Sequence, residues 1–192
     1  MIALCSVMQA QSLVEQLQLP NKNNKEVKES YGIILFCAAT ARVDDKADLA
    51  GQLIRSASNY KKEHEDAFAA DDFRNLSKVP QKVINIKGTT LLLYLSHENM
   101  EAITEAIEDV GAGALVAQLM DQHMPKGAAK AARTFGVKIP KLTRKINKKY
   151  LNKRQWPKFQ KKDTGLGVIV EWNLLSMAFG IVDYTRIITV TV

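Results

Sequence analysis

The hydrophobic positions of the N-terminal half predict helices around one buried strand. Residues 2–17 carry apolar side chains at helical spacing. Residues 31–43 form a continuous apolar run rich in strand-forming residues, which we interpret as a buried strand. A helix with one apolar face begins at Asp44, where acidic residues suit the helix dipole, and a shorter helix is predicted within residues 64–77.

The C-terminal half predicts strands on both sides of a helical region. Residues 82–87 alternate between apolar and polar and residues 90–95 follow, which predicts either two strands or one strand with a break at Gly88. Ser96 is a plausible N-cap for an amphipathic helix with an acidic outer face. Further strands are predicted at 166–172, 176–183 and 185–192.

The order of these elements favours an α+β fold over a doubly wound parallel sheet, because the strands are segregated along the chain. We expect a mixed or mostly antiparallel sheet covered by amphipathic helices. With 192 residues, the chain is long enough to bury a core without crosslinks, and we expect residues 1–192 to form a single domain.

The distribution of charge changes this picture of an ordinary globular domain. Residues 126–162 contain 14 of the 27 basic residues and none of the 20 acidic ones. The remaining 13 basic and 20 acidic residues leave the rest of the chain at a formal −7, although the whole chain carries +7. A segment of +14 without acidic residues indicates an anionic partner.

The basic segment is predicted to be helical, up to Gly136 and again after Pro140. Leu142, Ile146 and Tyr150 fall at steps of four residues, so the second helix has one apolar stripe among basic side chains. The side chains predicted to bind an anionic surface are Lys138, Lys141, Arg144, Lys145, Lys148, Lys149, Lys153 and Arg154. The apolar side chains predicted to enter a membrane interface are Leu142, Ile146, Tyr150, Trp156 and Phe159.

This pattern favours association with an anionic lipid membrane, as in a membrane-active or toxin-like protein. The high apolar content of residues 165–182 adds to that interpretation. A nucleic-acid partner is the alternative, since the same lysines could contact phosphates. The third hypothesis is self-assembly, in which the acidic face of one copy meets the basic segment of the next; that face comprises Glu98, Glu101, Glu105, Glu108 and Asp109.

The sequence contains no recognisable catalytic signature. His64, His97 and His123 stand outside any zinc motif, and no nucleophile motif or phosphate-binding loop occurs, so we expect a non-enzymatic protein without metal or cofactor. Cys5 and Cys37 are predicted to be small buried hydrophobes, although their pairing is left open. No signal peptide or transmembrane helix is recognised, so we expect the protein to be soluble as made.

Overall fold

The computed structural model describes residues 12–20, 23–69, 79–109, 111–139, 141, 144, 151–163, 165–181 and 185–191. It confirms the α+β class, with an antiparallel sheet covered by helices. The strands are β1 (Ile84–Lys87), β2 (Thr90–Leu95), β3 (Val168–Asn173) and β4 (Thr185–Thr189), in the spatial order β1-β2-β3-β4. Two strands are present on either side of Gly88, and they pair as an antiparallel hairpin with Lys87 opposite Thr90.

The register of the strands gives the sheet two different faces. Leu93 lies between Ile84 and Val170 on the face that packs into the main hydrophobic core. The opposite face carries a smaller cluster centred on Leu92 and Ile169. It also carries polar side chains, such as Glu171, which lies 3.0 Å from the Arg186 guanidinium of β4. The first face therefore contributes to the main core, whereas the second carries a small apolar cluster beside an ion pair whose Arg186 side chain is exposed.

The strand predicted at 31–43 is wrong, because this stretch belongs to the long helix α2 (Asn24–Val43). Residues 33–41 are almost completely buried, and the helix contacts α3 (Ala47–Glu63), α6 (Lys126–Thr134), α9 (Leu174–Ala178) and β1. A helix covered on nearly all sides needs apolar residues around its whole circumference, so its sequence loses the helical period. The side chain of Asn23 caps the helix by accepting a hydrogen bond from the Glu26 amide at 3.0 Å.

Helix α2 approaches the hairpin of β1 and β2 closely at Gly32. A Cβ atom on Gly32 would lie 2.7 Å from Ile86 Cγ2 and 2.9 Å from the Gly88 carbonyl oxygen. Any larger side chain at this position would push the helix away from the sheet. Gly32 thus fixes how tightly the helical layer sits on the sheet edge.

The other predicted helices are mostly confirmed. They are α3, the 3-10 turn η1 (Glu65–Phe68), α4 (His97–Ala106), α5 (Gly111–His123) and α6, and residues 12–17 are also helical. The short helix α8 (Trp156–Gln160) was not predicted, since the basic helix was expected to end near Asn152, before Pro157. The strand predicted at 176–183 is wrong over its first residues, which end helix α9 and form a turn. Its last two residues lie outside the described ranges.

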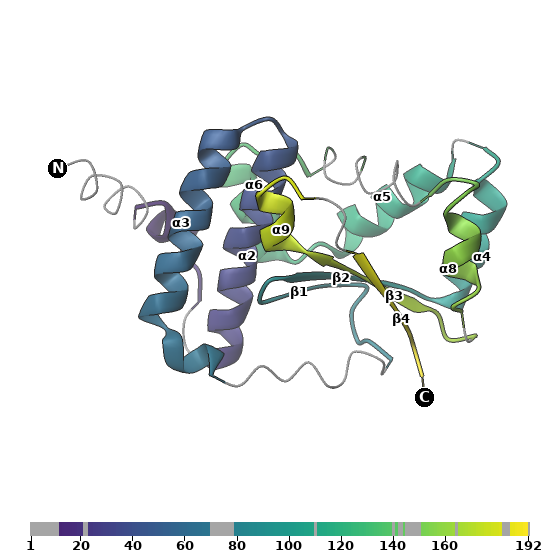
Figure 1. Cartoon of the computed structure of the whole chain (residues 1–192), viewed down its shortest axis with the longest axis horizontal. Helices are drawn as coiled ribbons and strands as arrows, with labels where there is room; N and C mark the ends of the chain where they lie inside the picture. The colour runs from purple at the N-terminus through teal and green to yellow at the C-terminus, as the bar shows by residue number, and fades with distance from the viewer. Residues whose placement is uncertain are drawn as a thin grey trace.

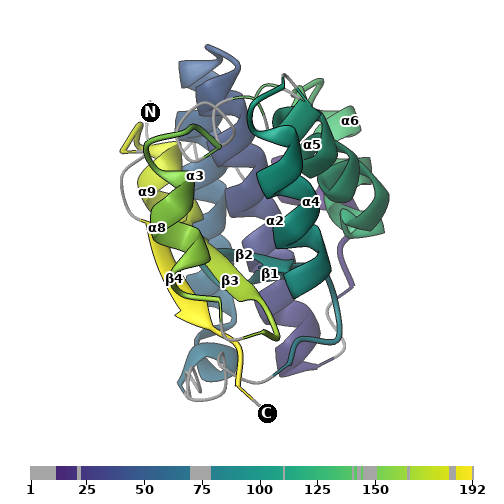
Figure 2. The same cartoon turned by 90° about the vertical axis from the view of Figure 1, so that its right-hand side faces the viewer.

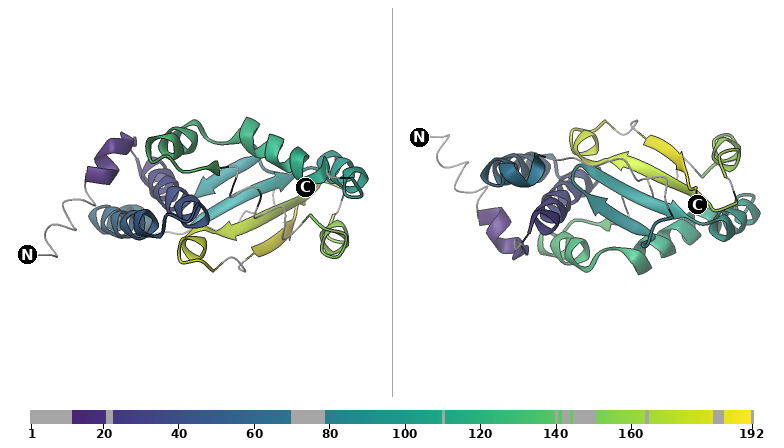
Figure 3. Two further views of the ribbon diagram at one scale, coloured as in Figure 1. Left: turned by 90° about the horizontal axis from the view of Figure 1, so that it is seen from above. Right: turned by 90° about the horizontal axis from the view of Figure 1, so that it is seen from below.

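The helices surround the sheet at its ends and along its sides. Helices α2 and α3 stand together at one end, and α4 and α8 lie at the other (Figures 1 and 2). Seen from above, α5 and α6 run along the β1 side of the sheet, and α9 lies on the β4 side (Figure 3). Among the described helices, none combines the length and apolar content that crossing a bilayer would require.

Candidate anion-binding surfaces

Helix α6 begins the basic segment and turns its charges outward. Ala128, Ala131 and Ala132 are buried towards α2, which α6 contacts. Lys126, Lys130 and Arg133 are exposed. The helix is amphipathic, but its apolar face consists of alanines that already belong to the protein core. It therefore offers only positive charge to a partner.

The chain after α6 is fastened to the corner between α2 and α3. The Lys141 Nζ atom lies 2.6 Å from Asp44 Oδ1, and the Lys46 ammonium donates a hydrogen bond of 2.6 Å to the Gly136 carbonyl oxygen. Lys46 also lies 3.8 Å from the other Asp44 oxygen. Two lysines thus converge on one carboxylate, and Gly136 and Lys141 are held at the C-terminal end of α2.

The Asp44 carboxylate is the electrostatic centre of this corner. Its side chain is only 3% exposed. The hydrogen bond from Lys141 lowers the pKa of Asp44 and outweighs its burial, and the nearby charges of Lys46 and Lys138 lower that pKa further. The same contact raises the pKa of Lys141. Both groups therefore stay charged at neutral pH.

The remaining predicted residues of the second basic helix lie mostly outside the described ranges. Positions 141 and 144 are helical, and Arg144 is exposed. Its charge acts against that of Lys141 by lowering the pKa of Lys141, so the two side chains are near each other. The predicted site residues outside the described part of the chain are Leu142, Lys145, Ile146, Lys148, Lys149 and Tyr150.

The end of the basic segment forms a second cationic group around α8. Its exposed side chains are Lys153, Arg154, Lys158, Lys161 and Lys162, which we call the α8 surface. Lys153 pairs with Glu108, which follows the acidic face of α4 in the same molecule. One contact between the acidic and basic regions thus forms within a single copy.

Trp156 and Phe159 do not lie on this surface, and the prediction that they enter a membrane interface is wrong for this fold. Their side chains are 2% and 6% exposed, and both belong to the main hydrophobic core. The Trp156 indole N–H donates a hydrogen bond of 2.9 Å to the Thr104 hydroxyl of α4. The spacing of aromatic residues among lysines arises because short helix α8 packs one side against the core.

The basic segment does not form one continuous surface in the described part of the chain. Helix α6 and the Asp44 corner lie beside α2, whereas α8 lies at the far end of the sheet (Figures 1 and 2). A partner that meets one cationic group need not touch the other. The sequence predicted all of these charges as one unit, because they are adjacent along the chain.

Sequence reasoning missed three exposed residues beside the Asp44 corner. Phe179 and Ile181 follow α9 and are 58% and 60% exposed, and Gly180 lies between them. A Cβ atom on Gly180 would lie 3.3 Å from Arg42 Nε, so the turn passes directly beside the end of α2. The sequence included these apolar residues only in a predicted strand and in the general apolar content of residues 165–182, and no periodic signal marks a turn here.

We call this region the helix-end surface. It comprises Arg42, Lys46, Lys138, Lys141, Arg144, Phe179 and Ile181. It combines five basic side chains with two exposed large apolar ones. Such a combination is typical of surfaces that dock on charged, amphiphilic partners.

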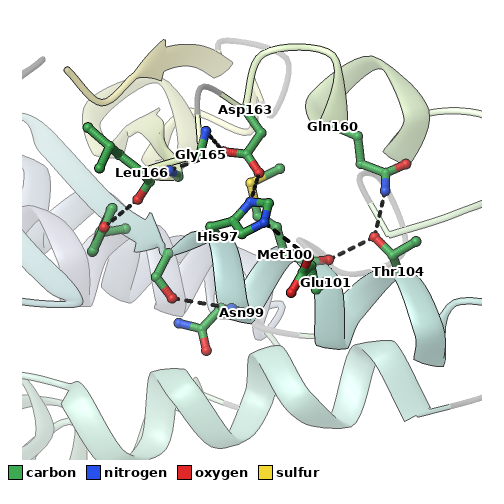
Figure 4. A network of polar contacts seen from close by, with 12 residues as sticks. His97, Asn99, Met100, Glu101, Thr104, Gln160, Asp163, Gly165 and Leu166 are labelled. Carbon is green, nitrogen blue, oxygen red and sulfur yellow. Dashed lines mark hydrogen bonds and ion pairs between the residues drawn. The ribbon is translucent and has the colours of Figure 1, made fainter.

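A separate polar network joins α4 to the loop that follows α8 (Figure 4). His97 Nδ1 lies 2.5 Å from Asp163 Oδ2, and His97 Nε2 lies 3.0 Å from Glu101 Oε1. The other Asp163 oxygen accepts hydrogen bonds from the amides of Gly165 and Gly167, at 3.0 and 3.1 Å. Asp163 is therefore held in place from both sides.

This network resembles half of a catalytic triad, but its geometry favours a structural role. Asp163 and Glu101 raise the pKa of His97, and the hydrogen bonds from His97 and the two glycine amides lower the pKa of Asp163 despite its burial. Both imidazole nitrogens face carboxylates, so neither is directed at a nucleophile. Within the described ranges, no cluster of His, Cys, Asp and Glu has the arrangement of a metal site.

Neither a protein-family model, nor a curated protein, nor a solved structure gives a significant match to this chain.

Proposed function

We propose that the protein binds anionic membranes peripherally through the helix-end surface. The observation that supports this most directly is the exposure of Phe179 and Ile181, at 58% and 60%, on either side of Gly180, which lies beside the Arg42 guanidinium. Exposed apolar side chains beside cations suit the boundary between lipid headgroups and acyl chains. The proposal keeps the membrane partner expected from the sequence but replaces the apolar residues that would insert.

The two kinds of contact are individually weak. Burying one large apolar side chain contributes about 1.5–3 kcal/mol. Each lysine or arginine near an anionic membrane contributes about 1 kcal/mol. Binding therefore needs both kinds of contact at once, and it should be reversible, dependent on anionic lipid and sensitive to salt.

The cations of the helix-end surface do not contribute equally. Lys46 and Lys141 already face Asp44, so that carboxylate offsets part of their charge. Arg42, Lys138 and Arg144 are exposed and are the main candidates for contact with headgroups. The lysines of α6, beside the same end of α2, would add to the attraction at longer range.

A nucleic-acid partner is the principal alternative outcome. Trp156 and Phe159 are buried, so these two rings cannot stack on bases, and around α8 the described residues offer contacts to phosphates. Self-assembly is a third outcome, but Glu108 already pairs with Lys153 within one copy.

The test is co-sedimentation of the full chain with liposomes, with and without phosphatidylserine. The variants are Phe179→Ser combined with Ile181→Ser, and Arg42→Gln combined with Lys138→Gln and Arg144→Gln. We expect each set to weaken binding to the anionic liposomes by about tenfold or more. Each removed cation costs about 1 kcal/mol of binding free energy, and each removed apolar side chain costs about 1.5–3 kcal/mol. Liposomes of phosphatidylcholine alone should bind weakly in every case.

Matched controls remove the same chemistry elsewhere. Lys158→Gln, Lys161→Gln and Lys162→Gln together remove three charges from the α8 surface, and Val79→Ser removes an apolar side chain that is 53% exposed. We expect both controls to bind liposomes almost as tightly as the wild type. Equal losses in test and control variants would refute a specific surface. Binding to duplex DNA in a gel shift without binding to liposomes would favour the nucleic-acid alternative.

A further inference from the structure

A second site lies at the opposite end of α2 from the helix-end surface. Here the first turns of α2, strand β1 and the chain leading into β1 enclose a cavity of about 510 Å³. Figure 1 shows α2 running past the sheet, so that its N-terminal turns lie on the other side of the sheet from its C-terminal end. The volume falls within the range of about 300–1,000 Å³ that is usual for small-molecule sites.

The polar lining of the cavity is strongly cationic. It includes four lysines, Lys25, Lys28, Lys82 and Lys87, and one acidic residue, Glu29. The lysines come from two segments, since two lie on α2 and two flank or end β1. None of these lysines belongs to residues 126–162, so the cationic segment identified from the sequence does not account for them. A cavity with this excess of positive charge selects an anionic ligand.

The apolar lining of the cavity is aliphatic. Ile86, Leu92 and Ile169 contribute from the sheet, and Val79 and Pro80 from the chain before β1. Leu92 and Ile169 belong to the smaller hydrophobic cluster on the second face of the sheet. Among the residues that the structure describes, the lining has no aromatic ring. These aliphatic walls favour a hydrocarbon chain over a planar base.

We propose that this cavity binds an amphipathic anion, which has a phosphate or carboxylate head and an aliphatic chain. The lysines contact the head, and the chain lies over Leu92 and Ile169 on the second face of the sheet. The site is separate from the helix-end surface, so it goes beyond the proposed membrane association and can fail or succeed independently.

The test is isothermal titration calorimetry of the full chain with four probes, each below its micelle concentration. Decyl phosphate and decanoate carry both features and differ in the head. Inorganic phosphate carries only the charge, and decanol carries only the chain. We expect one or both amphipathic anions to bind more tightly than either partial probe by about tenfold or more, because charge and apolar contacts each contribute.

Two exposed lysines of the cavity provide the decisive variant. Lys82→Gln combined with Lys87→Gln should weaken the preferred amphipathic anion by about tenfold or more, since charge-assisted contacts are lost. Lys126→Gln combined with Lys130→Gln removes the same charge from α6 and should leave that affinity within about twofold, because screening weakens distant charges. Thermal melts of both double variants establish that they are folded.

A third variant tests the apolar lining. Val79→Ser should weaken decyl phosphate or decanoate but leave inorganic phosphate unchanged. The proposal is overturned if decanol binds as tightly as the amphipathic anions, or if none of the probes binds. It is also overturned if the cavity and α6 variants lose affinity equally, which would indicate attraction to overall charge.

Discussion

The helix-end surface and the α8 surface each carry five basic side chains, but the large apolar side chains beside them differ in their exposure. Beside the first, Phe179 and Ile181 are exposed at 58% and 60%. Beside the second, Trp156 and Phe159 are buried in the core. Similar charge therefore produces two different surfaces, of which only the first has apolar groups that a membrane interface could receive.

The difference follows from how each surface is built. The α8 surface comes from one short stretch of chain, whose few apolar residues are needed to hold that stretch to the core. The helix-end surface combines three distant segments: the end of α2, the chain after α6 and the turn after α9. Because other residues hold those segments in place, Phe179 and Ile181 can remain exposed. An amphipathic surface can thus arise where no single segment has an amphipathic sequence.

The largest expected effect is on the free energy of unfolding, where replacing a buried aromatic residue should cost far more than replacing an exposed one. Trp156→Ala should destabilise the protein by about 3–5 kcal/mol, because it empties a core position and leaves Thr104 without its indole donor. Phe179→Ala should change stability by less than about 0.5 kcal/mol, since surface substitutions seldom do more. Urea unfolding followed by circular dichroism measures both values. A nearly neutral Trp156→Ala variant that loses liposome binding would restore the role predicted for Trp156 from the sequence.

The next effect concerns the contact that fastens the helix-end surface. Lys141→Gln removes the closest cation from the Asp44 carboxylate, which is 3% exposed. We expect the pKa of Asp44 to rise towards its ordinary value of 3.8 or above it, and the melting temperature at pH 7 to fall. NMR titration of the Asp44 carboxyl carbon measures the pKa directly.

Lys138→Gln is the matched control for this contact. Lys138 is exposed and acts on Asp44 only through its charge. Its removal should raise the pKa of Asp44 less than Lys141→Gln does and should change the melting temperature less. Equal shifts in the two variants would mean that the hydrogen bond from Lys141 does not hold this corner together.

The sequence predicted much of the fold. Strands with clear alternation or flanking turns, such as 82–87 and 90–95, were placed correctly. The stretch 31–43 was misassigned because a helix buried on nearly all sides has no polar face to reveal its period. The Asn23 cap and the polar residues after it were the signals that could have indicated a helix start.

The candidate site was less accessible from the sequence. The exposed lysines and arginines could be predicted, since long charged side chains are rarely buried. The position of the turn at Gly180 beside Arg42 depends on how α9 packs against α2, and nothing local in the sequence encodes that approach. The cavity lysines are likewise far apart in sequence, so only the fold brings Lys25 near Lys87.

Raising the pH through the pKa of His97 should weaken the network of His97 and Asp163 beside α8. It should leave the contact between Lys141 and Asp44 intact. The pKa of His97 is raised above its ordinary value of 6.5, so its stabilising contribution is complete below pH 6.5 and is lost as pH rises through the raised pKa. The pKa of Lys141 is raised above 10.5, so its pairing with Asp44 persists through this range. Hydrogen exchange between pH 6 and 9.5, corrected for intrinsic rates, should therefore show selective loss of protection at Gly165 and Gly167.

In acid, the network at Asp163 and the contact at Asp44 should both weaken. Asp163 and Asp44 both have pKa values below their ordinary 3.8, so each contribution is present above pH 3.8 and is lost as pH falls through the lowered pKa.

His97→Gln is the control for the prediction at higher pH, and it should abolish the loss of protection at Gly165 and Gly167. Persistence of that change in the variant would show that another group, and not His97, controls it.

The smallest expected effect is at the ion pair between Lys153 and Glu108, whose side chains are 67% and 68% exposed. A double-mutant cycle with Lys153→Gln and Glu108→Gln should give a coupling energy of about 0–1 kcal/mol, because solvent screens exposed pairs. The value should shrink further in high salt. A coupling above this range would mean that the acidic region after α4 neutralises the α8 surface substantially. The Glu108→Gln variant would then free those lysines and bring their attraction for anionic liposomes closer to that of the helix-end surface.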